Sequence, residues 1–203
     1  MLVRAGIVGE NTKTYDVFNR FISSDFLSIP KMSPSNYVSY CWNQYKTNYL
    51  QTEGKQPDNS LNGNVFEAII ATVLFREKIK PFYLQASVTY VPNAAFDILL
   101  CTRDNKIITL SLKTSFRERY KQADLEGMAL RNVHRTAQNY LITMNAAEAE
   151  NVKRKIGNQE VMFINGVIVA DQNEFDDFTA FLKKNKYKKS GRVPVISSDI
   201  LIK

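Results

Sequence analysis

Apolar residues recur at helical spacing over residues 10–50, and this period predicts that the first part of the chain is helical. A second helix in this region is expected to begin at Ser33, a capping residue that Pro34 follows at the first helical position. One face of this helix has a residue at every fourth position: Tyr37, Cys41, Tyr45 and Tyr49. Such a stripe more often packs in the core, although aromatic side chains beside Lys46 can also stack on bases.

Residues 50–60 are rich in Gly, Pro, Asn and Asp, and this composition predicts a loop. A continuous apolar face then predicts a helix over residues 61–78, which Ser60 is expected to cap. After Pro81 the pattern changes to alternating β-branched and aromatic residues. It predicts three strands, the last two joined by a turn at Arg103–Lys106: residues 82–91, 95–102 and 106–114.

Helical and strand patterns alternate in the rest of the chain. Helices are predicted at residues 118–138, 146–156 and 173–184, the last one capped by Asn173. Strands are predicted at residues 140–144, 161–170 and 194–202, the second of them either straight or a hairpin bent at Asn165-Gly166. This order predicts an α/β fold in which a central mixed sheet is flanked by helices.

The length of 203 residues suits one compact domain. We expect a helical N-terminal part at residues 1–60, a core at residues 61–145 and a C-terminal α/β part at residues 146–203.

Asp97 and Lys113 lie among apolar residues on two neighbouring predicted strands. A charged group in a half-buried strand needs a partner or a metal ion. Alternation along the strand places Ser111 and Lys113 on one face. Asp97 joins that face if the hairpin loop has an odd number of residues or a bulge, whereas a two-residue Asp104-Asn105 loop would turn it away. The plain alternative is an incidental ion pair in a sheet.

These residues resemble the PD-(D/E)XK nuclease superfamily, and within it the type II restriction endonucleases. The acid that usually precedes x-Lys is replaced here by Ser111. One branch of the family has Ser or Thr, any residue, Lys and then a Glu in the following helix. Here Ser111-Leu112-Lys113 is followed, after twelve residues, by Glu126. The family also often has an acid on the helix before the strands, and Glu67 resembles it. The resemblance covers about residues 61–145.

The resemblance implies a restriction-endonuclease-like core that binds Mg²⁺ and cleaves DNA. Asp97, Glu126 and the backbone carbonyl of Leu112 are the expected metal ligands, because Mg²⁺ prefers oxygen. Lys113 is expected to position or help deprotonate the attacking water and to stabilise the pentavalent transition state. Ser111 is expected to hydrogen-bond a ligand. Glu67 is expected to act through a second metal, a water or Lys113, and the number of metal ions stays open.

Polar and cationic residues follow Lys113 directly and suit contacts with phosphate. Six residues are candidates for DNA binding: Thr114, Ser115, Arg117, Arg119, Lys121 and Arg131. A charged helix start that faces only solvent is an equally good reading for any one of them.

The net charge of +7 is concentrated near the C-terminus. Six cations occur there with no acid among them: Lys183, Lys184, Lys186, Lys188, Lys189 and Arg192. The other 21 basic residues are nearly balanced by 20 acids. A concentrated basic stretch favours a polyanion as partner, and a solvated helix end is the alternative.

Several classes of protein are disfavoured. A single histidine, His134, argues against histidine-rich metal sites, and we expect it to be exposed on a helix. Cys41 and Cys101 are too few for a disulfide framework, which together with the absence of a signal peptide indicates the cytoplasm. No Gly-rich loop ends in Gly-Lys-Ser/Thr, so ATP use is not expected, and no apolar run reaches membrane-spanning length.

The sequence thus predicts a sequence-specific endonuclease that acts on double-stranded DNA with Mg²⁺ and leaves a 5′-phosphate and a 3′-hydroxyl, as the resemblance implies. Cutting both strands requires two sites, which predicts a homodimer or a small catalytic subunit paired with a larger one. Two alternatives stay open. One is a structure-specific or repair nuclease with the same core, and the other is a DNA-binding module with a degenerate site.

Overall fold

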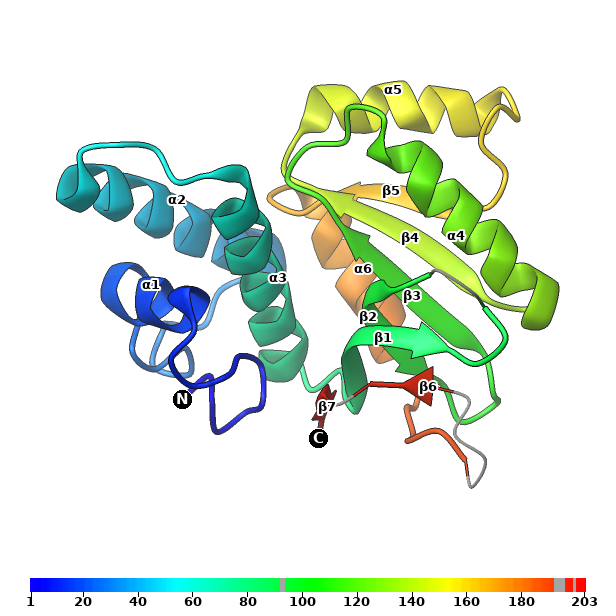
Figure 1. Ribbon diagram of the computed structural model, residues 1–203, viewed down its shortest axis with the longest axis horizontal. Helices are drawn as coiled ribbons and strands as arrows, with labels where there is room; N and C mark the ends of the chain where they lie inside the picture. The colour runs from blue at the N-terminus through cyan, green and yellow to red at the C-terminus, as the bar shows by residue number, and fades with distance from the viewer. Residues whose placement is uncertain (92–93, 192–195, 199) are drawn as a thin grey trace.

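The computed structural model describes residues 1–91, 94–191, 196–198 and 200–203. It has the predicted α/β fold, with a central mixed sheet and helices on both of its faces (Figure 1). The N-terminal part is helical, as expected, and the sheet begins only after residue 81.

Three helices form the N-terminal part: α1 (Lys13–Phe21), α2 (Pro34–Glu53) and α3 (Asn59–Arg76). Each begins at a side chain that accepts a backbone N–H from the first helical turn. Ser33 caps α2, which confirms the predicted start. The prediction for α3 is wrong by two residues, because the carboxylate of Asp58, and not Ser60, accepts the Leu61 N–H at 2.7 Å.

The sheet has seven strands among the described residues, in the order β5-β4-β3-β2-β1-β6, with β7 also paired to β1. Strands β1, β2 and β3 are antiparallel neighbours, whereas β3, β4 and β5 run parallel. Their bounds are β1 (Phe82–Val88), β2 (Phe96–Cys101), β3 (Ile107–Leu112), β4 (Gln138–Thr143), β5 (Gly166–Val169), β6 (Ile196–Ser197) and β7 (Ile200–Ile202).

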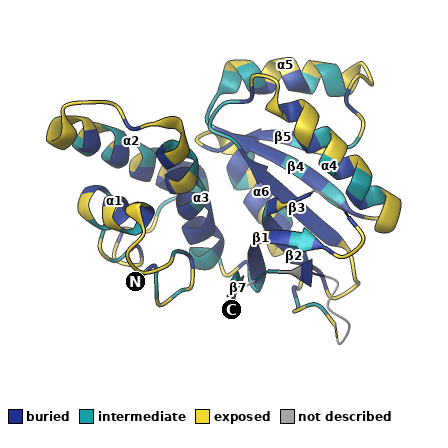
Figure 2. Cartoon of the chain, viewed as in Figure 1, coloured by how far each residue is buried: buried dark blue, intermediate teal, exposed yellow. Residues whose placement is uncertain are grey.

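Helices cover the two faces of the sheet separately. Helices α1, α2, α3 and α6 (Asn173–Lys183) share one apolar core with the inward residues of β2 and β3, such as Ile98, Leu100 and Leu110. Helices α4 (Arg119–Val133) and α5 (Ala146–Gly157) cover the other face. Figure 2 shows the resulting burial, with the strands buried and the outer faces of the helices exposed. Cys41 is buried, as its place in the Tyr37–Tyr49 stripe predicted, and Cys101 is buried as well.

Four further predicted boundaries are wrong. Helix α4 ends at Val133, because His134 leaves the helical conformation and the chain turns back to start β4 at Gln138. The segment before Gly166 is neither strand nor hairpin, since Asp124 accepts the N–H groups of residues 162 and 163. Gln172 and not Asn173 occupies the cap of α6. The predicted last strand is two short strands, and Pro194 lies outside the described residues.

Candidate active site

The loop of the β2–β3 hairpin has an odd number of residues, which is the condition for Asp97 to share a face with Lys113. Ile98 pairs with Leu110 and Cys101 with Ile107, and the Thr102 N–H donates to the Lys106 carbonyl at 2.9 Å. The loop proper is therefore residues 103–105, with Asn105 in the left-handed conformation at φ 66°. A three-residue loop that ends in this conformation is a common hairpin turn. Its parity places Asp97 on the same face as Ser111 and Lys113.

Asp97 and Lys113 meet at the end of the hairpin. The Lys113 Nζ donates to Asp97 Oδ2 at 2.9 Å, and the Leu112 N–H donates to the same oxygen at 2.6 Å. The two side chains are only 16% and 22% exposed, Asp97 and Lys113 respectively. Asp97 Oδ1 accepts no hydrogen bond from the described residues, so this half-buried carboxylate keeps one oxygen for another ligand.

Glu67 approaches this pair from α3. Burial raises the pKa of Glu67 to about 7, and the negative charge of Asp97 adds to the rise. The Gln85 Nε2 donates to Glu67 Oε2 at 2.8 Å and Lys113 lies near enough to act on its charge, and both lower that pKa. Gln85 stands in β1 with φ 47°, a conformation that few residues other than glycine adopt. This irregular position puts the amide beside the acid.

Glu126 approaches the same pair from α4. Burial raises its pKa, Lys113 lowers it and Asp97 raises it, so all three groups lie within electrostatic reach of one another. Its Oε1 accepts a hydrogen bond from Gln122 Nε2 at 2.8 Å. Among the described residues, Glu126 forms no direct hydrogen bond with Asp97 or Lys113. The next residue, Gly127, lets α4 lie close to the sheet, because a Cβ there would stand 2.5 Å from the Phe163 carbonyl oxygen.

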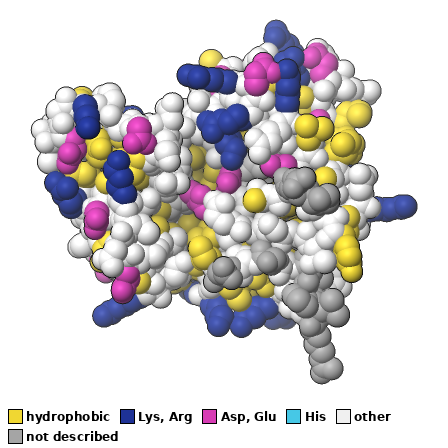
Figure 3. Space-filling model, viewed as in Figure 1, with side chains coloured by type: hydrophobic (Ala, Val, Ile, Leu, Met, Phe, Trp, Pro, Cys, Tyr) yellow, Lys and Arg dark blue, Asp and Glu magenta, His cyan; other side chains and the backbone are white. Residues whose placement is uncertain are grey.

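A polar cleft of about 230 Å³ opens over the Asp97–Lys113 pair. Six of the predicted site residues line it: Glu67, Asp97, Leu112, Lys113, Thr114 and Arg119. A second cleft of about 450 Å³ shares Asn64, Glu67 and Gln85 with it and continues along α3 to the loop before α1. Figure 3 shows this hollow between the helical part and the sheet, with acidic side chains in it and a group of Lys and Arg side chains beside it.

Other predicted residues lie outside the cleft. Ser111 is 3% exposed and packed inside the sheet. Lys121 forms an ion pair with Glu118 on the surface of α4. Arg131 lies near the other end of α4, where it donates to Asn165 Oδ1 at 2.7 Å and to the Ala137 carbonyl. Its contacts hold α4 to the start of β5.

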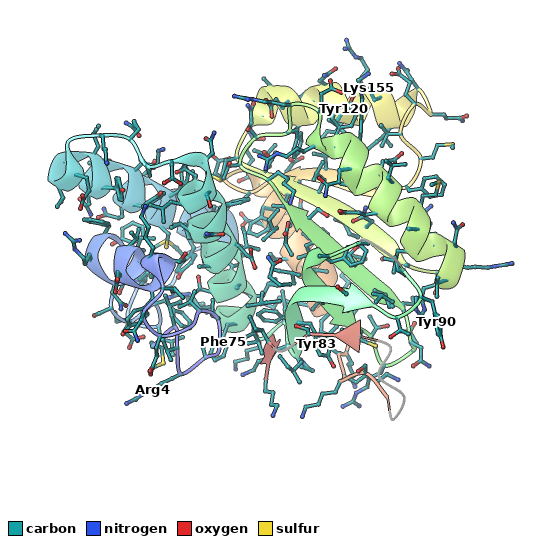
Figure 4. The ribbon with its side chains drawn as sticks, viewed as in Figure 1. Arg4, Phe75, Tyr83, Tyr90, Tyr120 and Lys155 are labelled. Carbon is teal, nitrogen blue, oxygen red and sulfur yellow. The ribbon has the colours of Figure 1, made fainter. Side chains whose placement is uncertain are left out.

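The segment between β3 and α4 is held in place from both sides. The Phe116 side chain is buried, and its N–H donates to the carboxylate of Glu148 at the start of α5. The Arg119 guanidinium donates to the Ser115 carbonyl at 2.9 Å, while Arg117 is exposed with φ 43°. Figure 4 shows the nearby Tyr120 beside Lys155, where α4 and α5 meet. Thr114, Ser115 and Arg119 are thereby fixed next to Lys113.

Sequence reasoning missed the roles of Gln85, Glu148 and the polar start of α3. Gln85 sits in a predicted strand with nothing to mark its unusual conformation. Glu148 follows Asn145, a helix cap, and acids at such positions usually act on their own helix. Asn59 and Asn64, which also line the cleft, had only the polar composition of the helix start as a signal.

His134 differs from its prediction. It is half-buried at the end of α4, burial lowers its pKa, and its Nε2 has no partner among the described residues. It lies at the opposite end of α4 from Arg119, so its ring takes no part in the cleft.

The cleft offers oxygen donors that suit a hard divalent cation. Within the described residues, no three His, Cys, Asp or Glu side chains lie close enough together to hold a metal ion by themselves. Mg²⁺ typically takes one or two carboxylates and fills its other positions with water and substrate phosphate. Asp97 Oδ1 and the Leu112 carbonyl, with Glu126 and Glu67 nearby, fit that pattern.

Comparison with known proteins adds little. No family model matches the chain, and no curated protein matches it. A solved structure described as a complex of the restriction endonuclease PspGI with substrate DNA aligns with 83% of this chain and 87% of its own, at 14% identity and a TM-score of 0.48. A likeness at this level carries no weight for activity, so the function rests on the cleft itself. In the described part of the chain, no helix combines the length and apolarity needed to cross a bilayer.

Proposed function

We propose that the chain is a Mg²⁺-dependent endonuclease that hydrolyses phosphodiester bonds in double-stranded DNA, with the sequence specificity of a type II restriction endonuclease. The observation that carries the proposal is the Asp97–Lys113 pair in a polar cleft that Glu67 also lines. A half-buried acid and base of this kind, with perturbed neighbours, are typical of a site for chemistry.

Asp97, the Leu112 carbonyl and Glu126 would hold the Mg²⁺ ion, either directly or through water. When bound, the ion supplies positive charge to the phosphate oxygen and lowers the pKa of a bound water. The Leu112 N–H and the Lys113 ammonium both donate to the Asp97 carboxylate and hold it in a fixed orientation. This arrangement explains why the carboxylate tolerates burial.

Lys113 has two tasks in the proposed reaction. Its ammonium holds Asp97 in the free protein, and it would orient the attacking water and stabilise the charge that builds on the phosphate. Glu67 is suited to receive the proton of that water, because a base works best when its pKa lies near the operating pH and that of Glu67 is about 7.

The phosphate backbone would lie along the cleft. Thr114 and Arg119 line it and would contact phosphates on either side of the cut, with Ser115 and Arg117 in the same segment. Each chain carries one such cleft. A double-strand cut therefore requires two chains, either a homodimer or this chain paired with a larger subunit.

The test is cleavage of phage DNA by the purified protein in Mg²⁺, beside reactions with EDTA and with Asp97→Asn. We expect discrete bands from the wild-type protein and intact DNA in both controls. A smear would indicate a less specific nuclease, and preferential cutting of junctions or flaps would indicate a structure-specific one. DNA that stays intact across several divalent metals, although the protein binds it, would favour the non-catalytic DNA-binding module.

A further inference from the structure

A group of cations lies at the opposite end of the central strands from the cleft. Six residues define it, and we call it the basic edge: Lys80, Arg103, Lys186, Lys188, Lys189 and Lys203. Figure 3 shows Lys and Arg side chains gathered along the lower side of the molecule, below β7 in that view. The predicted basic stretch supplies half of the basic edge. Arg192 of that stretch lies outside the described residues.

The chain after α6 is tied to the hairpin and not left as a loose tail. Tyr187 is buried and bridges Thr102, and its hydroxyl donates to the Leu182 carbonyl at 2.7 Å. The Arg103 N–H donates to the Lys186 carbonyl, and the Lys188 N–H to the Cys101 carbonyl. Side chains alternate along such an extended segment. The burial of Tyr187 therefore turns Lys186 and Lys188 away from the core.

A second anchor extends the basic edge toward the end of the chain. The Ser190 N–H donates to the Tyr83 hydroxyl at 2.9 Å, and Figure 4 shows Tyr83 close to the final strands. Lys189 and Lys203 come close enough that the Lys203 ammonium lowers the pKa of Lys189. The Lys80 Nζ reaches the Lys203 carbonyl at 3.2 Å. Like charges are thus held together by a fixed backbone.

The nearby acids are already neutralised. Asp104 accepts from Lys106 at 2.9 Å, and Glu77 accepts from Lys183 at 2.7 Å. Four cations of the basic edge lie in the hairpin or after α6, and none of them forms an ion pair with a described residue: Arg103, Lys186, Lys188 and Lys189. The undescribed residues 192–195 and 199 contain one Arg and one Asp, which leave the net charge of this region unchanged. Fixed, unpaired like charges favour a polyanionic partner.

The basic edge is separate from the cleft. Asp97 stands at one end of β2 and Thr102 just past the other, and the five residue steps from one to the other span ~17 Å at ~3.4 Å per residue. Duplex DNA carries one negative charge per ~1.7 Å of helix axis, so a duplex held at the cleft still presents phosphates ~17 Å further along. We propose that the basic edge is a second DNA-binding surface, which captures the phosphate backbone of duplex DNA independently of sequence and away from the cut. This inference rests on the proposed function for its choice of DNA as the polyanion.

The test measures binding without cleavage. The full-length protein is titrated with a fluorescent 40-base-pair duplex in EDTA, and Kd is determined over a range of NaCl concentrations. The variant Lys186→Gln/Lys188→Gln/Lys189→Gln is compared with a control that removes three exposed cations of the helical part, Arg4→Gln/Lys31→Gln/Lys55→Gln. Thermal unfolding of each variant confirms that it folds. An Arg version, Lys186→Arg/Lys188→Arg/Lys189→Arg, tests whether charge alone restores binding.

Each phosphate contact contributes ~0.9 to the slope of log affinity against log salt concentration. We expect the basic-edge variant to lower that slope by ~2 to 3, the control to leave it near the wild-type value, and the Arg version to restore it. A change in slope no larger than that of the control would overturn the proposal. It would also be overturned if a duplex RNA bound more tightly than the duplex DNA and this binding were lost in the same triple Lys→Gln variant. Cleavage is not read in this assay. A failure of the nuclease proposal can therefore be told apart from a failure of this one.

Discussion

Replacing Glu67 with Gln should stabilise the protein at high pH and leave its stability unchanged at low pH. Burial raises the pKa of Glu67 from its ordinary value of 4.5 to about 7. Below pH ~4.5 the side chain is protonated in both the folded and the unfolded chain. Between pH 4.5 and 7 the unfolded chain loses this proton first, so unfolding becomes easier as the pH rises.

The size of the effect follows from the pKa. At ~1.4 kcal/mol per pKa unit, holding a carboxylate whose pKa is about 7 in place of 4.5 costs the folded protein ~3 kcal/mol above pH 7. Glu67→Gln removes the ionisable proton and keeps the shape, and its amide can still meet Gln85. The stability gain of the variant should grow from near zero at pH 4.5 to ~3 kcal/mol at pH 8.

The assay is urea unfolding at several pH values in EDTA, followed by circular dichroism. Wild type, Glu67→Gln and Glu10→Gln are compared, since Glu10 is exposed and makes no ion pair with a described residue. Glu10→Gln should follow the wild type at every pH. Parallel curves for wild type and Glu67→Gln would refute the reasoning, because they would mean that Glu67 ionises as readily in the folded protein as in the unfolded chain.

Three further predictions concern the same site. Lys113→Met should lower the single-turnover cleavage rate ~100- to 1,000-fold at saturating Mg²⁺, and a rate within tenfold of wild type would remove Lys113 from the mechanism. Glu126→Ala should raise the Mg²⁺ concentration for half-maximal cleavage ~10- to 100-fold, and an unchanged Mg²⁺ dependence would show that Glu126 is not part of the metal site. Gly127→Ala should cost ~1–3 kcal/mol in urea unfolding, because its Cβ would meet the Phe163 carbonyl and the Asn139 amide at 2.5 and 2.7 Å; a variant as stable as wild type would mean that α4 can move away from the sheet.

The elements of the fold followed from the sequence, whereas their ends did not. Apolar spacing, together with composition, located the helices and the long strands, because burial on one face leaves a periodic trace. The end of α4 left no such trace. Arg131, near this end, bonds to the Ala137 carbonyl and to Asn165, a residue far along the chain. Contacts of this kind exist only once the chain has folded.

The candidate site, like the fold, could be predicted only in part from the sequence. Asp97 and Lys113 were found because charges among strand residues are rare enough to be informative. Whether they share a face was undecided, because the answer depended on one backbone conformation, that of Asn105. Gln85 could not be found, since only the folded chain reveals that its unusual φ aims an amide at Glu67.

Ser111 connects these observations. The hairpin register places it directly across from Asp97, and it is 3% exposed. A second carboxylate at this position would oppose Asp97 in the sheet interior, and like charges in directly opposed strand positions destabilise each other. Because Ser111 is neutral, the further negative charge that would offset a divalent cation would come from outside the sheet.

Two helices carry acids that would supply that charge: Glu67 from α3 and Glu126 from α4, both with pKa values raised by burial. Both acids are harder to ionise than usual in the free protein. A divalent cation in the cleft would favour their charged forms, so its binding should release protons near neutral pH. Mg²⁺ affinity should accordingly rise with pH up to about 7, the pKa of Glu67, and level off above it. Isothermal titration in buffers of different ionisation enthalpy would measure these protons, and a proton count of zero at pH 6.5 would separate both acids from the metal.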